Sequence, residues 1–242
     1  MNEQVPRAMA PSREEIRAMP LSSNPKIVAQ LLADEQGSAL DIGCGDGKFT
    51  RLLASRFNSV SGIDVKEKKI AEAREAAKAA GVDVDFRAAS GEAIPYPDSS
   101  FDVVAFSNSL HHMPHAETAL REALRVLKSG GKLYIMEPVP SGNYHDATRL
   151  VNDETIVRTE AYQALLGLKE AKPDAEILYR ARREFASYDE WKADQIDRDM
   201  KRKALFDERE AQVREAFLSN AEREDGKLVF DSVFRVNLLT KA

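Results

Sequence analysis

Three glycines at alternating positions follow an acid at the end of a short apolar run: Asp41, Gly43, Gly45 and Gly47. Glycine adopts backbone conformations closed to other residues and lets the main chain approach a flat ligand closely. The segment therefore predicts a loop that lies against a nucleotide-like molecule. A dinucleotide-binding turn needs a third glycine where Lys48 stands, and a phosphate-binding P-loop needs Ser or Thr directly after that lysine, so the spacing fits neither.

A second acid, Asp64, follows the apolar residues Val60–Ile63, roughly 20 residues past the glycine loop. In nucleoside-binding folds an acid at this place accepts hydrogen bonds from the ribose hydroxyls. The simpler alternative is that it caps a helix that begins near Lys66. We expect the ribose role, because the glycine loop precedes this acid at the spacing that such folds use.

Four histidines follow the apolar runs that end at Phe106 and Met136: His111, His112, His115 and His145. Histidine takes up a proton near neutral pH more readily than any other side chain. We therefore expect His111, His112 and His145 to be catalytic bases or to orient a substrate, although a histidine pair can also serve only packing. The spacing of the histidines matches no zinc signature, so we predict no metal site.

The elements that must position these residues alternate regularly from residue 36. Short apolar strands separated by helices predict a parallel sheet with helices on both faces, that is, an α/β fold of the Rossmann-like, doubly wound kind. The strands are expected at Ala39–Ile42, Val60–Ile63, Val84–Arg87, Phe101–Phe106 and Lys132–Met136. The helices are expected at Pro25–Ala33, Lys48–Phe57, Lys66–Ala80 and His115–Leu127, with Gly81 and Gly130–Gly131 at helix C-caps.

The chain divides into four parts by composition. Residues 1–35 form an arm and a flanking helix, and residues 36–140 form the sheet. Residues 141–226 are charged and poor in glycine, which predicts a helical insertion that acts as a lid, an acceptor pocket or a dimer contact. Its helices are expected at Val151–Leu168 and Ala175–Arg183, and two more within Tyr188–Asn220. Residues 227–242 form one long or bent strand that completes the sheet.

The ordered set of motifs resembles the class I methyltransferases that use S-adenosylmethionine. The acid and glycine loop resemble the first motif of that family, and Asp64 resembles the acid of the second. Three further stretches agree in order: Ala89–Pro95, Phe101–Met113 and Leu124–Leu133. The resemblance covers about residues 36 to 138, and Phe101–Met113 is most similar to the small-molecule branch that contains quinone-biosynthesis enzymes.

This resemblance implies S-adenosylmethionine as cofactor and S-adenosyl-L-homocysteine as product. The implied cofactor-binding residues are Asp41, Gly43, Cys44, Gly45, Gly47, Asp64, Val65, Ser90, Gly91, Glu92 and Asn108. The glycine amides would lie near the methionine carboxylate, Val65 on the adenine face, and Asn108 beside the methionine portion. Ser90 replaces the aspartate that this family often places near the adenine amino group. Cys44 also suits the tight turn simply because it is small.

The formal net charge of −5 predicts neither a nucleic-acid partner nor an anionic membrane. No apolar run reaches the length of about 18 residues that a membrane span needs, and no signal-peptide core is present, so we expect a cytoplasmic protein. The partner would be a small-molecule acceptor with an oxygen, nitrogen, carbon or sulfur nucleophile. A homodimer stays open, as do an RNA or protein methyltransferase, a non-catalytic cofactor-binding protein and, least favoured, an NAD-dependent oxidoreductase.

Overall fold

The computed structural model describes residues 11–242, which form two compact units. Unit 1 comprises residues 11–23, 138–159 and 178–234, and unit 2 comprises residues 24–137, 160–177 and 235–242. Three elements pass from one unit into the other: α7 (Thr155–Leu166), β6 (Ala171–Phe185) and β8 (Lys227–Lys241). Residues 1–10 of the expected N-terminal arm lie outside the described residues.

Unit 2 is built on a parallel sheet, which confirms the predicted α/β, Rossmann-like class. Its first five strands are β1 (Ser38–Ile42), β2 (Ser59–Asp64), β3 (Asp85–Ala88), β4 (Phe101–Ser107) and β5 (Leu127–Pro138). They pair in the order β3-β2-β1-β4-β5, and the order continues through β8 to β6. All four pairings among the first five strands are parallel. The bounds of β1 to β4 lie within one residue of the predicted ones, whereas β5 begins five residues before its predicted start at Lys132.

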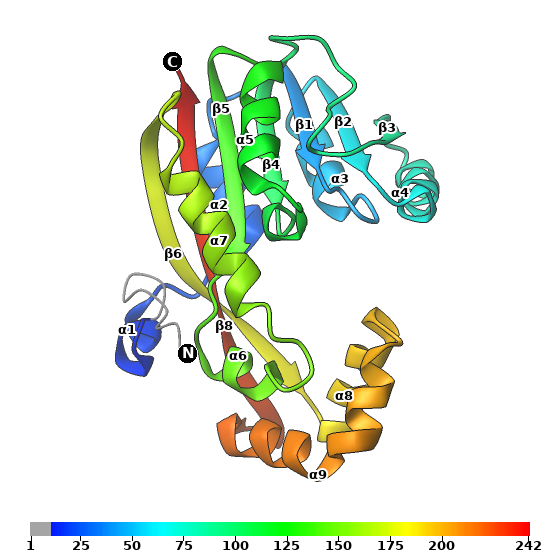
Figure 1. The fold of residues 1–242 in the computed structure, drawn as a ribbon, viewed down its shortest axis with the longest axis vertical. Coiled ribbons are helices and arrows are strands. Elements are labelled where there is room, and N and C mark those ends of the chain that lie inside the picture. The colour runs from blue at the N-terminus through cyan, green and yellow to red at the C-terminus, as the bar shows by residue number, and fades with distance from the viewer. Residues whose placement is uncertain (1–10) are drawn as a thin grey trace. The chain divides into compact units, whose positions relative to one another are not determined.

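The helices of unit 2 are α2 (Asn24–Leu31), α3 (Lys48–Ala54), α4 (Glu67–Ala79), the 3-10 turn η2 (Leu110–His112) and α5 (Ala116–Val126). Figure 1 shows α5 in front of the strands and α2 behind them. α5 turns a stripe of small and branched residues, such as Ala119 and Leu120, onto the strands. The resulting core is mainly aliphatic, with Leu40, Ile63 and Val104 fully buried.

The carboxyl ends of the central strands lie level with one another. In the register of the sheet, Ile42 of β1 pairs with Ile63 of β2 and with Phe106 of β4. Ser107, the last residue of β4, pairs with Met136 of β5. The loops that follow these strands therefore leave the sheet at one edge, which is where open α/β sheets bind ligands.

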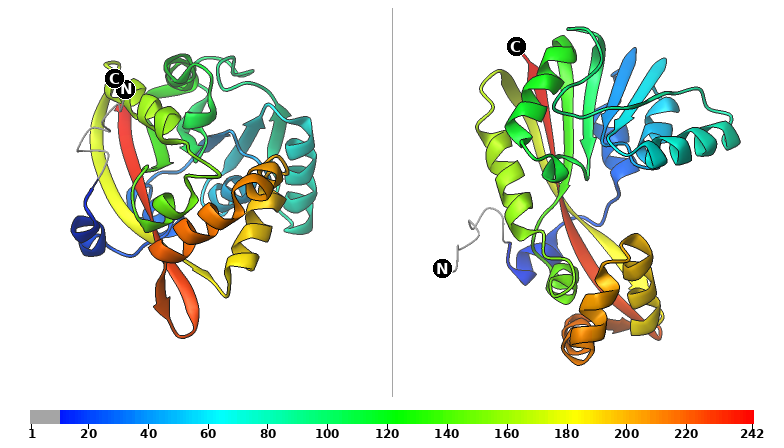
Figure 2. Two further views of the ribbon diagram at one scale, coloured as in Figure 1. Left: turned by 60° about the horizontal axis from the view of Figure 1, so that its bottom comes forward. Right: turned by 45° about the vertical axis from the view of Figure 1, so that its right-hand side comes forward.

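Unit 1 contains α1 (Arg13–Ala18), α6 (Asn143–Thr148), α8 (Tyr188–Arg198), α9 (Arg202–Asn220) and β7 (Glu222–Glu224). Ser12 and Glu15 form a capping box that begins α1. The views in Figure 2 show α8 and α9 as two separate helices. Their core is aromatic, since Trp191 stacks on Phe217 with ring centroids 4.3 Å apart.

The prediction of a wholly helical segment at residues 141–226 is wrong. Residues 175–183, expected as a helix, belong to the long strand β6, and β7 is a second strand of this segment. Tyr179 of β6 is buried and stacks on Phe234 of β8. The charges that suggested a helix are paired along the strand, where Arg180 Nη1 lies 2.9 Å from Asp231 Oδ2.

Two smaller predictions concern glycines after helices. Gly81 follows the last residue of α4 with a φ of 66°, as expected for a helix C-cap. Gly130 and Gly131 do not cap α5, because that helix ends at Val126 and both glycines lie within β5. A Cβ on Gly131 would lie 2.9 Å from the main-chain oxygen of Asp102. This glycine therefore permits close strand packing instead of ending a helix.

The remaining secondary-structure predictions for the second half of the chain are confirmed, whereas a lid, an acceptor pocket or a dimer contact in this segment stays a prediction. α7 lies within the expected helix at 151–168, α8 and α9 are the expected pair, and β8 is one long strand. Among residues 11–242, no helix is both long enough and apolar enough to cross a membrane.

Candidate active site

The glycine loop connects β1 to α3 and has a left-handed backbone at each glycine. The φ angles are 72° at Gly43, 54° at Gly45 and 74° at Gly47. Gly43 and Cys44 donate backbone hydrogen bonds to the carbonyl oxygen of Ile63, at 2.8 and 2.9 Å. The loop is therefore fixed to the end of β2 by its own main chain.

The three glycines differ in what surrounds them. A Cβ on Gly43 would lie 2.5 Å from Cβ of Ser109, and one on Gly47 would lie 2.8 Å from the ring of Phe86. A Cβ on Gly45 would meet no protein atom within 4 Å. Two glycines thus allow close packing within unit 2, whereas Gly45 borders open space that a ligand could occupy.

Asp41 lies inside β1 with 1% of its surface exposed. Its Oδ2 accepts a hydrogen bond of 2.6 Å from the Thr50 hydroxyl of α3. Burial raises the pKa of this carboxyl to about 7, although the bond from Thr50 opposes the shift. The side chain therefore braces the loop from behind, while direct contact with the cofactor amine stays a prediction.

Asp64 joins the glycine loop to the start of the helix that follows β2. Its Oδ2 accepts a hydrogen bond of 3.0 Å from Gly45 N, and its Oδ1 accepts one of 2.9 Å from Lys66 N. The carboxylate is partly exposed, and the next residue, Val65, is 64% exposed. An exposed valine beside an acid at the sheet edge fits the expected adenine and ribose contacts, which stay predictions.

Cys44 points away from this edge. It is 7% exposed and packs in a cluster with Ile70, Ala73 and Phe86. Burial, with Asp41 and Asp64 nearby, raises the pKa of its thiol well above the usual range. A thiol that stays protonated is a poor nucleophile, so Cys44 contributes its small size and its backbone.

The segment after β3 holds the start of α5. Ser90 Oγ accepts a hydrogen bond of 3.1 Å from Glu92 N, and Glu92 Oε1 accepts one of 2.8 Å from His115 N. Gly91 is buried, and a Cβ there would lie 2.8 Å from Ile42 Cγ2. Glu92 thus has a structural role at the N-terminus of α5, and the adenine contacts expected of this segment stay predictions.

Asn108 directly follows β4 in a left-handed conformation, with φ at 56°, and is exposed. Its backbone N–H donates to Met136 O at 2.8 Å, which holds the turn against β5. The next residue, Ser109, is buried, and its hydroxyl donates a 2.5 Å hydrogen bond to Ile42 O at the end of β1. Ser109 therefore ties the β4 turn to the strand that precedes the glycine loop.

His111 is nearly enclosed, with a side chain 3% exposed, and its Nδ1 forms a very short hydrogen bond with Glu137 Oε2. The other oxygen of Glu137 accepts backbone hydrogen bonds from Ser109 at 3.1 Å and from Leu110 at 2.8 Å. One carboxylate at the end of β5 thus orients the imidazole and holds the turn that carries it.

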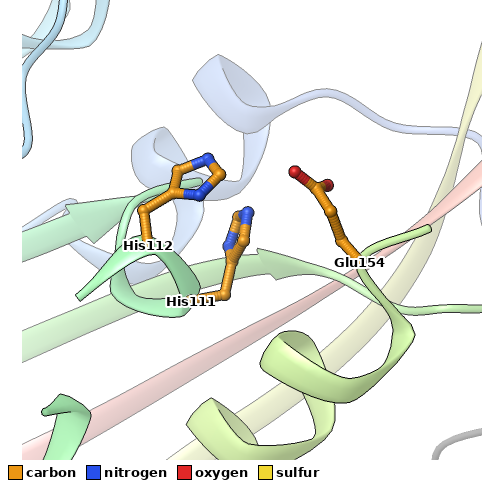
Figure 3. A group of neighbouring side chains, drawn as sticks. All are labelled: His111, His112 and Glu154. Carbon is orange, nitrogen blue, oxygen red and sulfur yellow. The ribbon is translucent and has the colours of Figure 1, made fainter. Parts of the chain in front are cut away.

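His112 lies beside His111, with ring centroids 4.0 Å apart (Figure 3). Its side chain is exposed, whereas that of its neighbour is buried. Glu154, also drawn in Figure 3, belongs to unit 1, where it accepts a hydrogen bond from Arg158. The structure therefore brings together two of the three predicted histidines.

His145 belongs to α6 in unit 1. Its Nε2 lies 3.3 Å from the Thr155 hydroxyl. The pKa of His145 is lowered, mainly by burial and secondly by the positive charge of Arg158. The side chain favours the neutral form, which suits a proton acceptor, but no observation relates it to the histidine pair.

Two side chains at the edge were not in the predicted set, namely Glu137 and Ser109. Glu137 directly follows an apolar strand segment, and Ser109 lies two residues past the end of β4. The ends of parallel strands are where such sheets carry their functional groups. That signal was available for Glu137, which follows Leu133–Met136. It was weaker for Ser109, because the bond from its hydroxyl to Ile42 depends on strand order.

Residues 40–135 match the methyltransferase domain family. The chain is 38% identical over 147 residues to 27-O-demethylrifamycin SV methyltransferase of Amycolatopsis mediterranei, a match that covers 56% of this chain and 54% of that protein. It is 38% identical over 109 residues to the ubiquinone/menaquinone biosynthesis C-methyltransferase of Ectopseudomonas mendocina, covering 43% of each chain. The chain thus matches about half the length of these curated relatives.

A crystal structure from Bacillus halodurans C-125 has a similar fold, with a TM-score of 0.67 at 19% identity, covering 91% of this chain and 99% of that one. At this identity the likeness concerns the fold alone, whereas the sequence matches span the loops at the sheet edge. The glycine loop, the topology and these matches together identify residues 40–135 as a methyltransferase domain of the class I kind, whose methyl donor is S-adenosylmethionine, and this domain is similar in sequence to that of a quinone-biosynthesis methyltransferase.

Proposed function

We propose that this protein transfers a methyl group from S-adenosylmethionine to a small-molecule acceptor. The observation that carries this proposal is the gathering, at the sheet edge of unit 2, of an open glycine position, an acid on the next strand and a histidine braced by a carboxylate. The first two suit a nucleoside, and the third suits removal of a proton.

The residues present fit the cofactor in kind. Gly45 borders open space where a Cβ would meet no protein atom, and Asp64 lies beside it with a partly exposed carboxylate. The exposed Val65 offers an apolar surface for a flat base. Bound S-adenosylmethionine would supply an electrophilic methyl group on a positively charged sulfur. We assign the ribose hydroxyls to Asp64 and the methionine portion to the side of Asn108.

We assign proton removal to His111. Because Nδ1 is held by Glu137, the imidazole has a fixed orientation. An acceptor hydroxyl would lose its proton to the opposite nitrogen, Nε2, as its oxygen bonds to the methyl carbon and the carbon–sulfur bond breaks. The electron pair of that bond stays on sulfur, which leaves S-adenosyl-L-homocysteine. His112 would orient the acceptor.

The charge distribution supports a small acceptor over a nucleic acid. Basic residues that form runs in the sequence are paired with acids, as for Arg180 with Asp231, Arg182 with Glu224, and Lys203 with Asp207. Paired charges offer little attraction to a phosphate backbone. The curated relatives also carry names of small-molecule methyltransferases.

The first test is cofactor binding. Calorimetric titration of S-adenosyl-L-homocysteine should give saturable binding, whereas NAD should give none. Asp64→Ala should weaken that affinity about 10-fold or more, because a charged acceptor of hydrogen bonds is lost, while thermal stability changes little. Undetectable binding to the wild-type protein would refute the proposal, and equal affinity in the variant would refute the ribose assignment only.

The second test is turnover. The protein is incubated with methyl-labelled S-adenosylmethionine and a metabolite extract of the source cell, and labelled products are identified by mass spectrometry. Once an acceptor is found, His111→Ala should lower kcat about 100-fold, within the usual range for a general base, with unchanged cofactor affinity. His112→Ala should chiefly raise the KM of the acceptor. Unchanged kcat in both variants would show that neither histidine acts in the reaction.

A further inference from the structure

A short chain of hydrogen bonds ends at Ser107, the last residue of β4. Tyr134 of β5 donates its hydroxyl proton to Asn24 Oδ1 at 2.5 Å, and Asn24 Nδ2 donates to Ser107 Oγ at 3.0 Å. All three residues belong to unit 2. The chain therefore joins the first residue of α2 to the last residue of β4 and to Tyr134 within the neighbouring strand β5.

The chemistry of the amide gives this chain a direction. An amide oxygen only accepts and an amide nitrogen only donates, so Tyr134 is a donor and Ser107 Oγ is an acceptor in these two bonds. The hydroxyl proton of Ser107 must then point elsewhere. Among residues 11–242, no side chain or main-chain group accepts this proton. An oriented donor without a protein acceptor is a group prepared for a ligand.

The position of Ser107 places this donor beside the proposed cofactor site. It precedes Asn108, where the backbone turns sharply with φ at 56°, and it is only partly buried. Tyr134 also stacks on Phe49 of α3, with centroids 6.0 Å apart, and that helix begins directly after the glycine loop. Asn24 thus links the β4 end and the first turn of α3, the two places expected to flank the methionine portion.

We propose that the hydroxyl of Ser107 binds a carboxylate oxygen of the methyl donor, and that Asn24 is a positioning residue that turns this hydroxyl toward it. The inference rests on the proposed function, because it needs the cofactor in the site. A carboxylate is the ligand group that fits best, since a hydroxyl held as a donor binds an anionic oxygen more strongly than a neutral one.

The first experiment compares two ligands that share the nucleoside but differ in the amino-acid arm. S-adenosyl-L-homocysteine has the carboxylate, and 5′-methylthioadenosine lacks it. Ser107→Ala should weaken the first ligand about 10-fold or more, as for a hydrogen bond to a charged group, and leave the second unchanged. Ser107→Thr retains the hydroxyl and is the matched control, with affinity close to the wild type. Thermal melting confirms that each variant is folded.

The second experiment tests the role of Asn24. Asn24→Asp replaces the donating nitrogen with an oxygen that accepts, so the proton of Ser107 turns toward it and away from the ligand. Asn24→Ala only lets the hydroxyl rotate. We therefore expect Asn24→Asp to weaken S-adenosyl-L-homocysteine more than Asn24→Ala does. A purely structural role predicts the reverse order, because the aspartate keeps both hydrogen bonds to its neighbours.

A double-variant cycle separates this effect from simple charge repulsion. In the Ser107→Ala background, Asn24→Asp should cause little further loss of affinity, because the hydroxyl through which it acts is gone. An undiminished loss in that background would overturn the role of Asn24. Equal affinity of Ser107→Ala and wild type for S-adenosyl-L-homocysteine would overturn the proposal, whereas a wild-type protein that binds neither ligand would refute the proposed function itself.

Discussion

The two units use different kinds of core. Unit 2 packs aliphatic side chains from successive strands and helices, so that each β/α segment adds a layer to the one before it. Unit 1 packs aromatic rings from elements far apart in the sequence, with Trp191 of α8, Phe217 of α9 and Phe230 of β8 in one cluster. The comparison shows that the residues of the proposed active site are positioned by elements that follow one another in the sequence. The core of unit 1 depends instead on contacts between residues that are far apart in the sequence.

The largest expected effect lies in the aromatic core. Trp191 is fully buried among several rings, so Trp191→Ala should lower the free energy of unfolding by about 3–5 kcal/mol. The matched change in unit 2 is Leu40→Ala, for which about 2–5 kcal/mol is expected. Chemical denaturation followed by circular dichroism measures both. A loss below 1 kcal/mol at Trp191 would show that the rings tolerate a cavity and would break the comparison.

The next prediction concerns the pH dependence of the free energy of unfolding that the buried carboxyl of Asp41 in unit 2 causes. Burial raises the pKa of Asp41 from 3.8 to about 7, so between these values the unfolded chain has released a proton that the folded chain keeps. The free energy of unfolding should therefore fall as pH rises from about 4 to about 7, by up to ~4 kcal/mol, and contribute no slope above that.

Asp41→Asn removes the titrating group and leaves an oxygen for the hydroxyl of Thr50. Its stability curve, measured against wild type by denaturation at several pH values, should lack this contribution. Parallel curves for the two proteins would show that the carboxyl titrates at its ordinary pKa.

A single added methyl group sharpens the comparison inside the glycine loop. Gly43→Ala places a Cβ 2.5 Å from Ser109 at a φ of 72° and should cost about 2–4 kcal/mol of stability. Gly45→Ala meets no protein atom, so it should cost about 1–2 kcal/mol from its left-handed backbone, and it should weaken S-adenosyl-L-homocysteine. Thermal melts and calorimetry separate the two quantities. Unchanged affinity in Gly45→Ala would place the ligand elsewhere.

The smallest effect belongs to the surface of unit 1. Arg182 pairs with Glu224 and lies near Glu184, but all three side chains are more than a third exposed. Such pairs contribute about 0–1 kcal/mol. Arg182→Ala should therefore change the unfolding free energy by less than 1 kcal/mol at moderate salt. A larger loss would mean that ion pairs stabilise β6, contrary to the interpretation that the burial of Tyr179 stabilises this strand.

The sequence predicted unit 2 well because its signals are local. Apolar runs of strand length, helical spacing and Gly81 identify each element without knowledge of its partners. The strand ends then follow from the rule that parallel strands share one edge, which brought Asp64, Asn108 and His111 to the same side. The start of β5 was misplaced, because Gly130 and Gly131 resemble a helix cap in sequence although they lie within the strand.

The sequence could not reveal what depends on pairing. β6 carries charges at a density typical of helices, and its extended form follows from pairing with β8, more than 40 residues away in the chain. The hydrogen bonds that Glu137 accepts from the β4 turn, and the one that Asn24 donates to Ser107, likewise join residues that only the strand order makes neighbours.

The long strands β6 and β8 limit how this protein can be truncated. Each contributes one end to unit 1 and the other to unit 2, so neither unit is an uninterrupted stretch of polypeptide. A protein shortened after residue 226 would lose β8 from between β5 and β6, and with it Leu228 and Phe230 from the core of unit 1. Studies of either half in isolation must therefore splice distant pieces with new linkers, and recombination between relatives should preserve these two strands intact.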